Sequence, residues 1–405
     1  MEIPVIEPPA IIDELIANYR HAFPEIRQFG HFSEYMAAMN VSDKKSIAHL
    51  NSLIPDHANQ SSMNRFLGSK MDTNMIFNTT AKLINSIEKD GILAIDDTIV
   101  EKTGKHIEGT SWLFDHSIGK NVFGMQLATS VFSGEYGIYP ISADVYRRLE
   151  SLKKENKGDE YKTKIEMQIG TIGKCLSAGL NFHTVAGDVW YFTKALVKYL
   201  NSQNLDWVFQ SKGNRKVKIK GRWNTLDLIP LSYPDSTTVR ISGNTYSVWV
   251  KEGNIRGIGN ARIVISEGIN GKRYYVTDRM DWNLKKILAT YLRRWDIEVL
   301  HRDLKQDGLG HIFLRKLCKT ELYLRLIVTG RVLLEISSIR SLSRYRVTKP
   351  VEKRKRWLAV ESLKSLAGIL KKYGKRFIDA IETSIMNPYR SARKIFKAIY
   401  NQDRI

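Results

Sequence analysis

Hydrophobic residues recur at helical spacing along residues 1–90. Apolar positions three and four apart run through 11–19 and again through 75–87, which is typical of amphipathic helices. The Ser42-Asp43 pair is expected to cap a further helix that ends near Leu53. Short helices at this spacing fit either a helix-turn-helix or a plain helical bundle, and the pattern does not separate the two.

The pattern changes from helices to strands at Gly91. Strand-like segments, rich in β-branched and aromatic residues, are predicted at 91–98, 122–132, 136–142, 181–188 and 207–210. Charged helical sequence at 144–170 and an amphipathic helix at 190–200 separate the last two strands from what precedes them. Three consecutive strands followed by helix, strand, helix and strand predict an α/β layer fold with a mixed sheet.

A β-rich stretch with Gly and Asn turns interrupts this order before helical sequence returns at 283–305. We therefore expect four parts. They are a helical N-terminal domain (1–90), an α/β domain assembled from 91–212 and 283–335, a β-rich insertion (213–282) and a basic helical C-terminal region (336–405).

The charge of the chain indicates what kind of molecule it binds. The 405 residues contain 63 Lys and Arg against 42 Asp and Glu, a net charge of +21, which favours nucleic acid as a partner. The excess is concentrated at 340–405, with 18 basic and 5 acidic residues, whereas 1–90 has 8 basic and 11 acidic residues. DNA contact by the N-terminal region therefore requires a local patch.

Other features exclude several classes of protein. The most apolar stretch, 321–337, is interrupted by Arg325 and Arg331, so no membrane span is expected. The N-terminal residues do not follow the pattern of a secretory signal, and Cys175 and Cys318 stand apart from any paired-cysteine spacing. We expect a cytoplasmic protein without a zinc site or a disulfide framework.

Acidic residues at the ends of two strands are the first sign of chemistry. Asp97 and Asp188 each close a predicted buried strand, where a carboxylate needs water or a cation beside it. A third acid lies on the helix predicted at 283–305, on a face that spans about 100° of arc. That face carries Tyr291, Arg294, Glu298, His301, Arg302 and Lys305. Taken alone it could be a solvated charged face; Ile297, Leu300 and Leu304 lie on the opposite side and are expected in the core.

Together, these acids indicate a metal site. Two aspartates and a glutamate supply hard oxygen ligands, which Mg²⁺ prefers, with Mn²⁺ able to substitute. Two such ions in one site would activate an attacking oxygen and stabilise a leaving one. The other residues of the helix face are predicted to contact DNA phosphates, namely Tyr291, Arg294, His301, Arg302 and Lys305. The combination predicts a phosphodiester-transfer site.

The spacing of the helix residues resembles a known family. Tyr291, Arg294, Glu298 and Lys305 are separated by 2, 3 and 6 residues, which is similar to the YREK signature of prokaryotic insertion-sequence DDE transposases. The segments 94–98 and 187–191 also resemble the family's two Asp motifs. The resemblance covers roughly 91–330 and assigns the metal-binding catalytic role to Asp97, Asp188 and Glu298; Asp96 is the alternative to Asp97.

The resemblance implies more than the residues themselves show. It implies a ribonuclease-H-like mixed sheet with helices on both faces, a β-rich insertion, and helical regions at both ends. It implies cut-and-paste transposition, in which transposon terminal repeats are cleaved and joined to target DNA by a homodimer. It also implies that an insertion aromatic handles a flipped base, with Trp223 and Trp249 as the candidates.

Basic residues elsewhere are further candidates for DNA contact. The stretch 211–223 has six basic residues and no acid, and from it Lys212, Arg215, Lys216 and Lys218 are predicted to bind DNA. A solvated hairpin edge is the simpler explanation of such a stretch. The block Lys353-Arg354-Lys355-Arg356 is a candidate phosphate anchor or a solvated helix face.

Two other functions remain open on the same residues. A metal-dependent nuclease would cut DNA without joining it, and a transposase-derived DNA-binding protein would do neither. The presence of all three acids and all four signature residues argues against the second, and the insertion and the basic tail argue mildly against the first.

Overall fold

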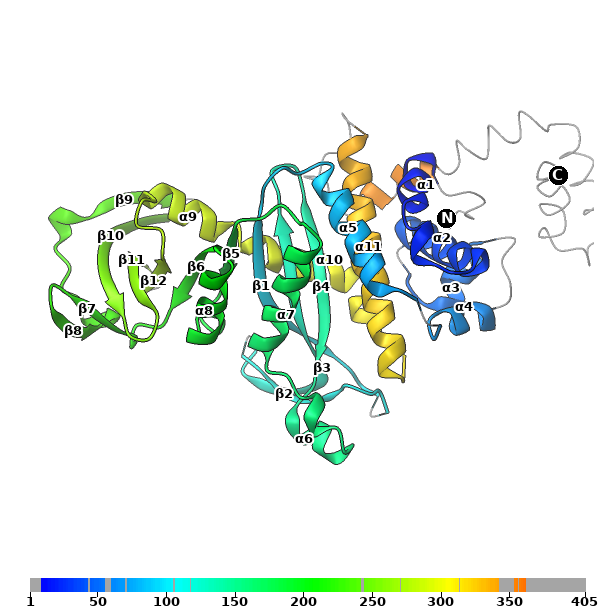
Figure 1. The fold of residues 1–405 in the computed structure, drawn as a ribbon, viewed down its shortest axis with the longest axis horizontal. Coiled ribbons are helices and arrows are strands. Elements are labelled where there is room, and N and C mark those ends of the chain that lie inside the picture. Colours follow the sequence, from blue (N-terminus) through cyan, green and yellow to red (C-terminus); the bar gives the residue numbers. More distant parts are fainter. Residues whose placement is uncertain are drawn as a thin grey trace, which may run out of the picture. The chain divides into compact units, whose positions relative to one another are not determined.

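The computed structural model describes residues 9–42, 44–54, 60–69, 71–104, 106–116, 118–241, 244–269, 271–312, 314–341, 353–355 and 357–361 (Figure 1). They form two compact units. One unit comprises 1–87, 104–108 and 303–405, and the other comprises 88–103 and 109–302. The division into four domains that the sequence predicts is not the same grouping and stays a prediction.

The first unit is helical. Its elements are α1 (Ala10–Ala17), η1 (Arg20–Ala22), α2 (Ile26–Val41), α3 (Ile47–Ser52), α4 (Gln60–Phe66), α5 (Thr73–Asn85), η5 (Leu309–His311) and α11 (Leu317–Arg340). The long helix α11 packs against α1, α2 and α5, and is buried along most of its length, as its apolar sequence requires. The helix predicted to start at Ser42 starts later, because Ser46 accepts the capping hydrogen bond from the His49 N–H.

Charged side chains form a buried cluster in the same unit, which we call the ion cluster. Its members are Asp303, Asp307, Arg331, Glu335, Arg354 and Lys355. Arg331 lies 3.2 Å from Asp303 and 3.5 Å from Glu335. Arg354 donates to Glu335 over 2.5 Å. Ion pairing offsets the cost of burying these charges.

The ion cluster changes the interpretation of the basic block at 353–356. Arg354 and Lys355 are buried against Glu335 and Asp307, so a phosphate-anchor role is wrong for both. Lys353 is exposed, and Arg356 lies outside the described residues, as does the basic C-terminal region after Glu361.

The second unit is built on one mixed sheet. Its strands are β1 (Ile92–Glu101), β2 (Ser111–Asp115), β3 (Lys120–Ser133), β4 (Ile138–Tyr146), β5 (Thr184–Gly187), β6 (Asp206–Ser211), β7 (Lys216–Ile219), β8 (Arg222–Thr225), β9 (Thr237–Ile241), β10 (Asn244–Ile255), β11 (Gly259–Gly268) and β12 (Gly271–Thr277). Its helices are α6 (Leu149–Lys154), η2 (Gly158–Glu160), α7 (Lys164–Ser177), α8 (Lys194–Ser202), η3 (Leu226–Leu228), η4 (Tyr233–Asp235) and α9 (Leu284–Leu292). Helix α10 (Trp295–Gln306) begins in this unit, and its last four residues, from Asp303 on, are grouped with the first.

Strand pairing confirms the predicted mixed α/β fold. β1, β3 and β4 pair antiparallel, and β1, β5 and β6 pair parallel, in the spatial order β4, β3, β1, β5, β6. The order of these five strands agrees with the mixed sheet predicted from the sequence. The additional strand β2 pairs with the first residues of β3.

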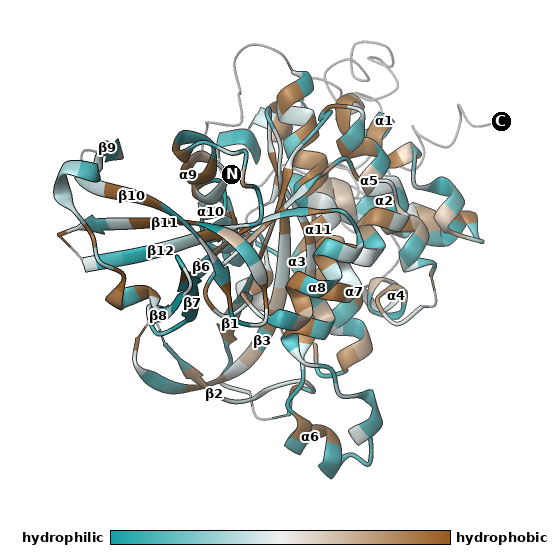
Figure 2. Ribbon diagram, turned by 60° about the vertical axis from the view of Figure 1, so that its left-hand side comes forward, coloured by the Kyte–Doolittle hydropathy of each residue, from teal (hydrophilic) through white to brown (hydrophobic). Residues whose placement is uncertain are grey.

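Helices cover both faces of this sheet. Side chains of successive residues in a strand point to opposite faces. On β3, Thr129 contacts His301 of α10, whereas the next residue, Ser130, donates to Gln168 of α7. Helices α7 and α10 therefore lie on opposite faces, and Figure 2 shows hydrophobic and hydrophilic residues alternating along α7 and α8, as covering helices require.

The β-rich insertion extends the sheet. Strand β12 pairs antiparallel with β6 from Val208 to Ser211, and β11, β10, β7 and β8 follow in order (Figure 1). Among the residues that the structure describes, no helix is long and apolar enough to cross a membrane.

We predict that the ion cluster stabilises the first unit. Replacing Arg354 by Met leaves the buried Glu335 with one cation fewer, and should lower the free energy of unfolding by about 2–4 kcal/mol. Urea unfolding followed by circular dichroism measures this. The exposed neighbour Lys353 is the matched control, and Lys353→Met should change stability by less than about 0.5 kcal/mol. Equal losses in the two variants would contradict the prediction.

Candidate active site

The parallel pairing of β1 with β5 brings two acids to the same level of the sheet. Ile95 pairs with Gly187, so Asp96 and Asp188, the next residue in each case, follow side by side. β5 ends at Gly187, but β1 continues to Glu101 because β3 still pairs with it. The sequence predicts that the acid of β1 ends its strand, but Asp96 and Asp97 both lie within β1. The neighbouring strand β5 is the one that ends beside them.

Arg294 links Asp96 to the acid on α10. Its guanidinium lies 3.3 Å from Asp96 and 2.6 Å from Glu298, and the side chain is 7% exposed. Glu298 itself is 43% exposed, so it can still be reached from solvent. A buried cation thus holds two acids from distant parts of the sequence at one place.

Asp97 points to the opposite face of the sheet from Asp96. Its carboxylate accepts from Lys164 Nζ over 2.9 Å, from the Tyr191 hydroxyl over 3.1 Å and from Gln126 Nε2 over 2.5 Å. None of these three partners of Asp97 was predicted from the sequence. Only Lys164 has a feature in the sequence that could have indicated a special role. It stands in the first turn of a helix, where a basic residue is unfavourable because it opposes the helix dipole.

Burial and crowding of negative charge raise the pKa of the acids. Burial and, to a smaller extent, the charge of Asp188 raise the pKa of Asp96 to about 7, and Arg294 opposes the rise. Burial also raises the pKa of Asp188, with Asp97 contributing, while the Trp190 backbone N–H bond to its carboxylate lowers it. The negative charge at this place is therefore only partly compensated by the protein.

The predicted helix at 283–305 is wrong as a single helix. It breaks into α9 and α10 at Arg293-Arg294, where the Arg294 N–H bonds to Tyr291 O and the Ile297 N–H to Arg294 O. The residues of the signature therefore do not share one continuous helix face. The three residues expected in the core, Ile297, Leu300 and Leu304, are at most 1% exposed, which confirms that side of α10.

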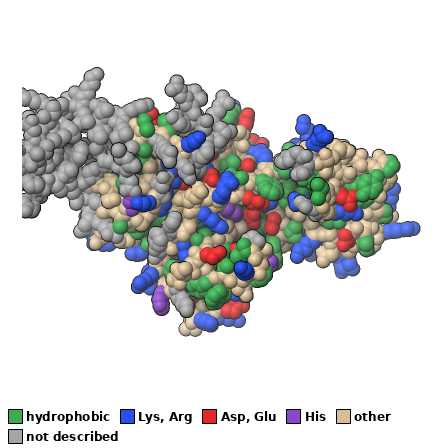
Figure 3. All heavy atoms as spheres, turned by 180° about the vertical axis from the view of Figure 1, so that it is seen from behind, with side chains coloured by type: hydrophobic (Ala, Val, Ile, Leu, Met, Phe, Trp, Pro, Cys, Tyr) green, Lys and Arg blue, Asp and Glu red, His purple; other side chains and the backbone are tan. Residues whose placement is uncertain are grey.

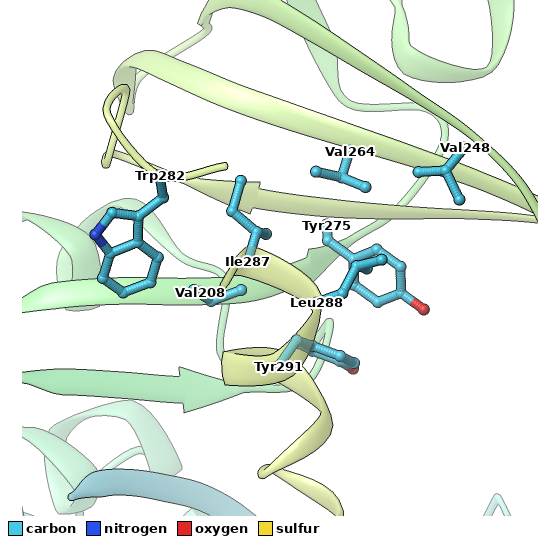
Figure 4. Close-up of a cluster of buried hydrophobic side chains, with 8 residues drawn as sticks. All are labelled: Val208, Val248, Val264, Tyr275, Trp282, Ile287, Leu288 and Tyr291. Atoms are coloured by element: carbon cyan, nitrogen blue, oxygen red, sulfur yellow. The ribbon is translucent and has the colours of Figure 1, made fainter. Parts of the chain in front are cut away.

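Tyr291 is part of a hydrophobic core (Figure 4). The members of that core are Val208, Val248, Val264, Tyr275, Trp282, Ile287, Leu288 and Tyr291. The Tyr291 ring packs 4.5 Å from Tyr275, and its hydroxyl donates to Gln210 over 2.9 Å. Burial raises the pKa of Tyr291 to about 12. The side chain joins α9 to the insertion and to β6; its predicted phosphate contact stays a prediction.

The remaining residues predicted on α10 differ in exposure. His301 is buried, and its Nε2 lies 2.7 Å from the Thr129 hydroxyl, so it fastens α10 to β3. Arg302 and Lys305 are exposed. Both are therefore placed where a phosphate could reach them.

The basic residues of the insertion also separate into two kinds. Lys212, Lys216 and Lys218 are exposed, and the last two share one face of β7, as predicted, with Val217 buried between them. Arg215 is instead half-buried over Phe192 and donates to its carbonyl oxygen.

Only one of the two insertion tryptophans proposed for a flipped base is accessible. Trp223 is 50% exposed, whereas Trp249 is 1% exposed and donates to Ser232 O. Trp249 is a core residue, and that candidate role is wrong for it.

The acids suit a divalent metal by their chemistry. Within the described ranges, no three His, Cys, Asp or Glu side chains stand close enough together to hold a metal as they are. Asp96, Asp188 and Glu298 nevertheless offer hard oxygens at a place where negative charge is undercompensated, which is what Mg²⁺ and Mn²⁺ require.

Much of the chain that contains this site is similar to known proteins. Residues 87–333 match the family model described as "Transposase DDE domain". Over 219 residues, 52% of the chain, the sequence is 28% identical to the probable transposase for insertion sequence element IS701 of Microchaete diplosiphon. The chain matches 56% of the length of that relative.

Two solved structures are similar over part of their length. The piggyBac transposase synaptic complex with hairpin DNA has a TM-score of 0.44 at 12% identity, over 88% of this chain and 77% of that one. The Drosophila P element transposase strand transfer complex has a TM-score of 0.22 at 12% identity, over 53% of this chain and 47% of that one.

We predict that removing the charge of Asp96 stabilises the protein at neutral pH. Its folded-state pKa of about 7 lies above the unfolded value, so its contribution to stability is complete below about pH 4 and is lost as the pH rises through 7. Asp96→Asn should therefore gain about 1–3 kcal/mol in urea unfolding at pH 8 and little at pH 4.

The adjacent Asp97 is the matched control for that measurement. It is paired with Lys164, so Asp97→Asn should give no gain at pH 8. A gain of the same size for both variants, or a gain independent of pH, would count against the electrostatic origin.

Proposed function

Because the chain belongs to the family of proteins with a transposase DDE domain, we propose that it is a DNA transposase, which cleaves the ends of an insertion sequence and joins them to target DNA. The observation that carries the proposal is the contact of the buried Arg294 with both Asp96 and Glu298, with Asp188 beside Asp96 where β5 ends. Membership of the subgroup with the YREK signature is part of the proposal.

For the first metal ligand, the contacts favour Asp96 over Asp97. Asp96 shares Arg294 with Glu298 and is repelled by Asp188, whereas Asp97 is engaged by Lys164 on the face covered by α7. We therefore propose Asp96, Asp188 and Glu298 as the ligands, in place of the Asp97 that the resemblance assigns. Asp97 remains the rival assignment.

The proposed cofactor is Mg²⁺, with Mn²⁺ able to substitute and two ions in each site. When bound, these ions supply Lewis acidity to the attacking and leaving oxygens of the phosphodiester. The protein's own part is positioning. Arg294 orients Glu298 from the β1 side, His301 fixes α10 on β3, and Tyr291 fixes α9 on β6 through Gln210.

Exposed basic residues are proposed to hold the DNA backbone. These are Arg302 and Lys305 on α10, and Lys212, Lys216 and Lys218 beside and within the insertion. Figure 3 shows Lys and Arg side chains at several points on the surface of the insertion. Such side chains contact phosphates without reading base sequence.

A nuclease with the same site is the second candidate, because cutting needs the same acids as joining. Incubation with DNA that carries both ends of the element, target DNA and Mg²⁺ separates the two functions. Products in which an element end is joined to target DNA indicate a transposase, and cut ends alone indicate a nuclease.

We predict that the three proposed ligands are needed for cutting and not for binding. Asp96→Asn, Asp188→Asn and Glu298→Gln should each lower the cleavage rate by at least about a thousandfold, since each removes a metal ligand. Their affinity for end DNA in EDTA, measured by gel shift, should stay within about threefold of the unchanged protein.

Asp97→Asn is the informative companion. It should keep a substantial part of the cleavage activity, because only the contact with Lys164, Tyr191 and Gln126 is altered. Loss of cleavage in Asp97→Asn, together with activity in Asp96→Asn, would return the catalytic role to Asp97.

We also propose a homodimer as the working form, because one active site processes one end and both ends must be joined. Light scattering of the complex with end DNA should give two protein chains and two DNA ends. A variant ending at Glu361 keeps the ion cluster and tests the residues beyond it, which should be needed for pairing if they hold the second end. Strand transfer of both ends by a complex with one protein chain would refute the dimer.

A further inference from the structure

An exposed tryptophan lies directly beside the proposed catalytic acids. Trp190 follows Asp188 by two residues, in the turn between β5 and α8, and its backbone N–H donates to the Asp188 carboxylate over 2.9 Å. Its side chain is 57% exposed. A large aromatic surface left in water beside a catalytic group indicates a surface that binds something.

Two lysines lie close to the Trp190 ring. Lys164 Nζ lies 5.5 Å and Lys212 Nζ 5.4 Å from the centre of the indole, although one comes from α7 and the other follows β6. The attraction of a cation to an exposed ring is weak, and two like charges at one ring repel each other. An anion beside the ring would relieve that repulsion. Lys164 is already paired with Asp97, so the exposed Lys212 is the cation that an incoming anion would meet. The place therefore combines a flat apolar surface with a cation that an anion can approach.

The aromatic surface continues away from the acids. The His116 ring lies 6.0 Å from Trp190, and the Phe114 ring lies 4.9 Å from His116. His116 is exposed and Phe114 is 50% exposed. Successive ring contacts thus connect Trp190, beside Asp188, to His116 and to Phe114 of β2, and we call these three residues the aromatic row.

This combination fits one class of ligand. Unpaired nucleotides offer a base that stacks on an aromatic ring and a phosphate that binds lysine, whereas the bases of a duplex are already stacked on each other. A protein partner would use the apolar surface but would bring no phosphate to Lys212, which is exposed beside the ring, whereas Lys164 already has Asp97 as its counter-charge. The acids next to Trp190 independently require a phosphodiester at this place if the proposed function holds.

We propose that Trp190, flanked by Lys164 and Lys212, is a stacking site for an unpaired nucleotide of the DNA strand whose phosphate lies at Asp188, and that His116 and Phe114 continue the site for the next nucleotides. The proposal rests on the proposed function for the identity of the DNA strand. It differs from the expectation that an aromatic residue of the insertion receives a displaced base.

The test compares two fluorescein-labelled DNA hairpins, one blunt and one with a four-nucleotide single-stranded 3′ overhang. Binding is measured by fluorescence anisotropy in EDTA, so that no cleavage occurs. The unchanged protein should bind the overhang hairpin more tightly than the blunt one. Trp190→Ala should weaken binding of the overhang hairpin about 5- to 100-fold, the range for loss of one stacked base, and leave blunt binding within about twofold.

Variants of matched type make the result specific. Trp190→Phe keeps a ring and should retain most of the preference for the overhang. Trp223 is a tryptophan of similar exposure in the insertion, and Trp223→Ala should have no effect on this preference. Lys212→Ala should lower the salt dependence of overhang binding by about one unit of slope.

Several outcomes would overturn the proposal. They are an unchanged preference in Trp190→Ala, an equal loss on both hairpins, or a loss confined to Trp223→Ala. Absence of any preference in the unchanged protein would point to a protein partner for the aromatic row. Since binding in EDTA does not depend on cutting, failure of the stacking site and failure of the catalytic proposal can be told apart.

Discussion

The position of Arg294 between two carboxylates is the interaction on which the rest of the site depends. Asp96 belongs to a central strand and Glu298 to a helix about two hundred residues later, and the guanidinium contacts both. Without a cation there, burial would favour protonation of one acid or its movement towards solvent. The break between α9 and α10 places Arg294 in the turn between the two helices. It also allows α9 to pack on the insertion while α10 packs on β3.

The hydrophobic pattern predicted the layers but not the partners of the polar residues. The strand end before Asp188, the five-strand core and the apolar side of α10 follow from periodicity, and the structure confirms them. The strand end predicted at Asp97 is wrong, because pairing with β3 extends β1 to Glu101. Which face of β1 meets Glu298 does not follow, because alternation separates Asp96 from Asp97 without saying which helix lies on either side. The break at Arg293-Arg294 also has no local signal, since arginine is a good helix former and no Gly or Pro stands there.

Counting basic residues proved a weak guide to DNA contact in this chain. Arg354 and Lys355 neutralise buried acids, and Arg215 lies over the Phe192 ring and donates to its carbonyl oxygen. A positive residue can serve a buried acid as well as a phosphate, and composition does not separate the two uses. Exposure does, and it leaves Lys212, Lys216, Lys218, Arg302 and Lys305 as the surface cations among the predicted contacts. The net charge of +21 still indicates a polyanionic partner, because the buried basic residues account for only part of the excess of Lys and Arg over Asp and Glu.

The hydrogen bonding of β12 to β6 makes the insertion part of the sheet and limits how the chain can vary. Removing 213–282 would strip β6 of its neighbour and leave Val208 and Phe209 on an open edge strand, which is a template for self-association. Shorter and longer relatives are therefore expected to differ in the connection between β8 and β9, where the chain makes two short 3-10 turns and few strand bonds are at stake. Engineered deletions or inserted tags should be placed there, and the junction with β6 should be left intact.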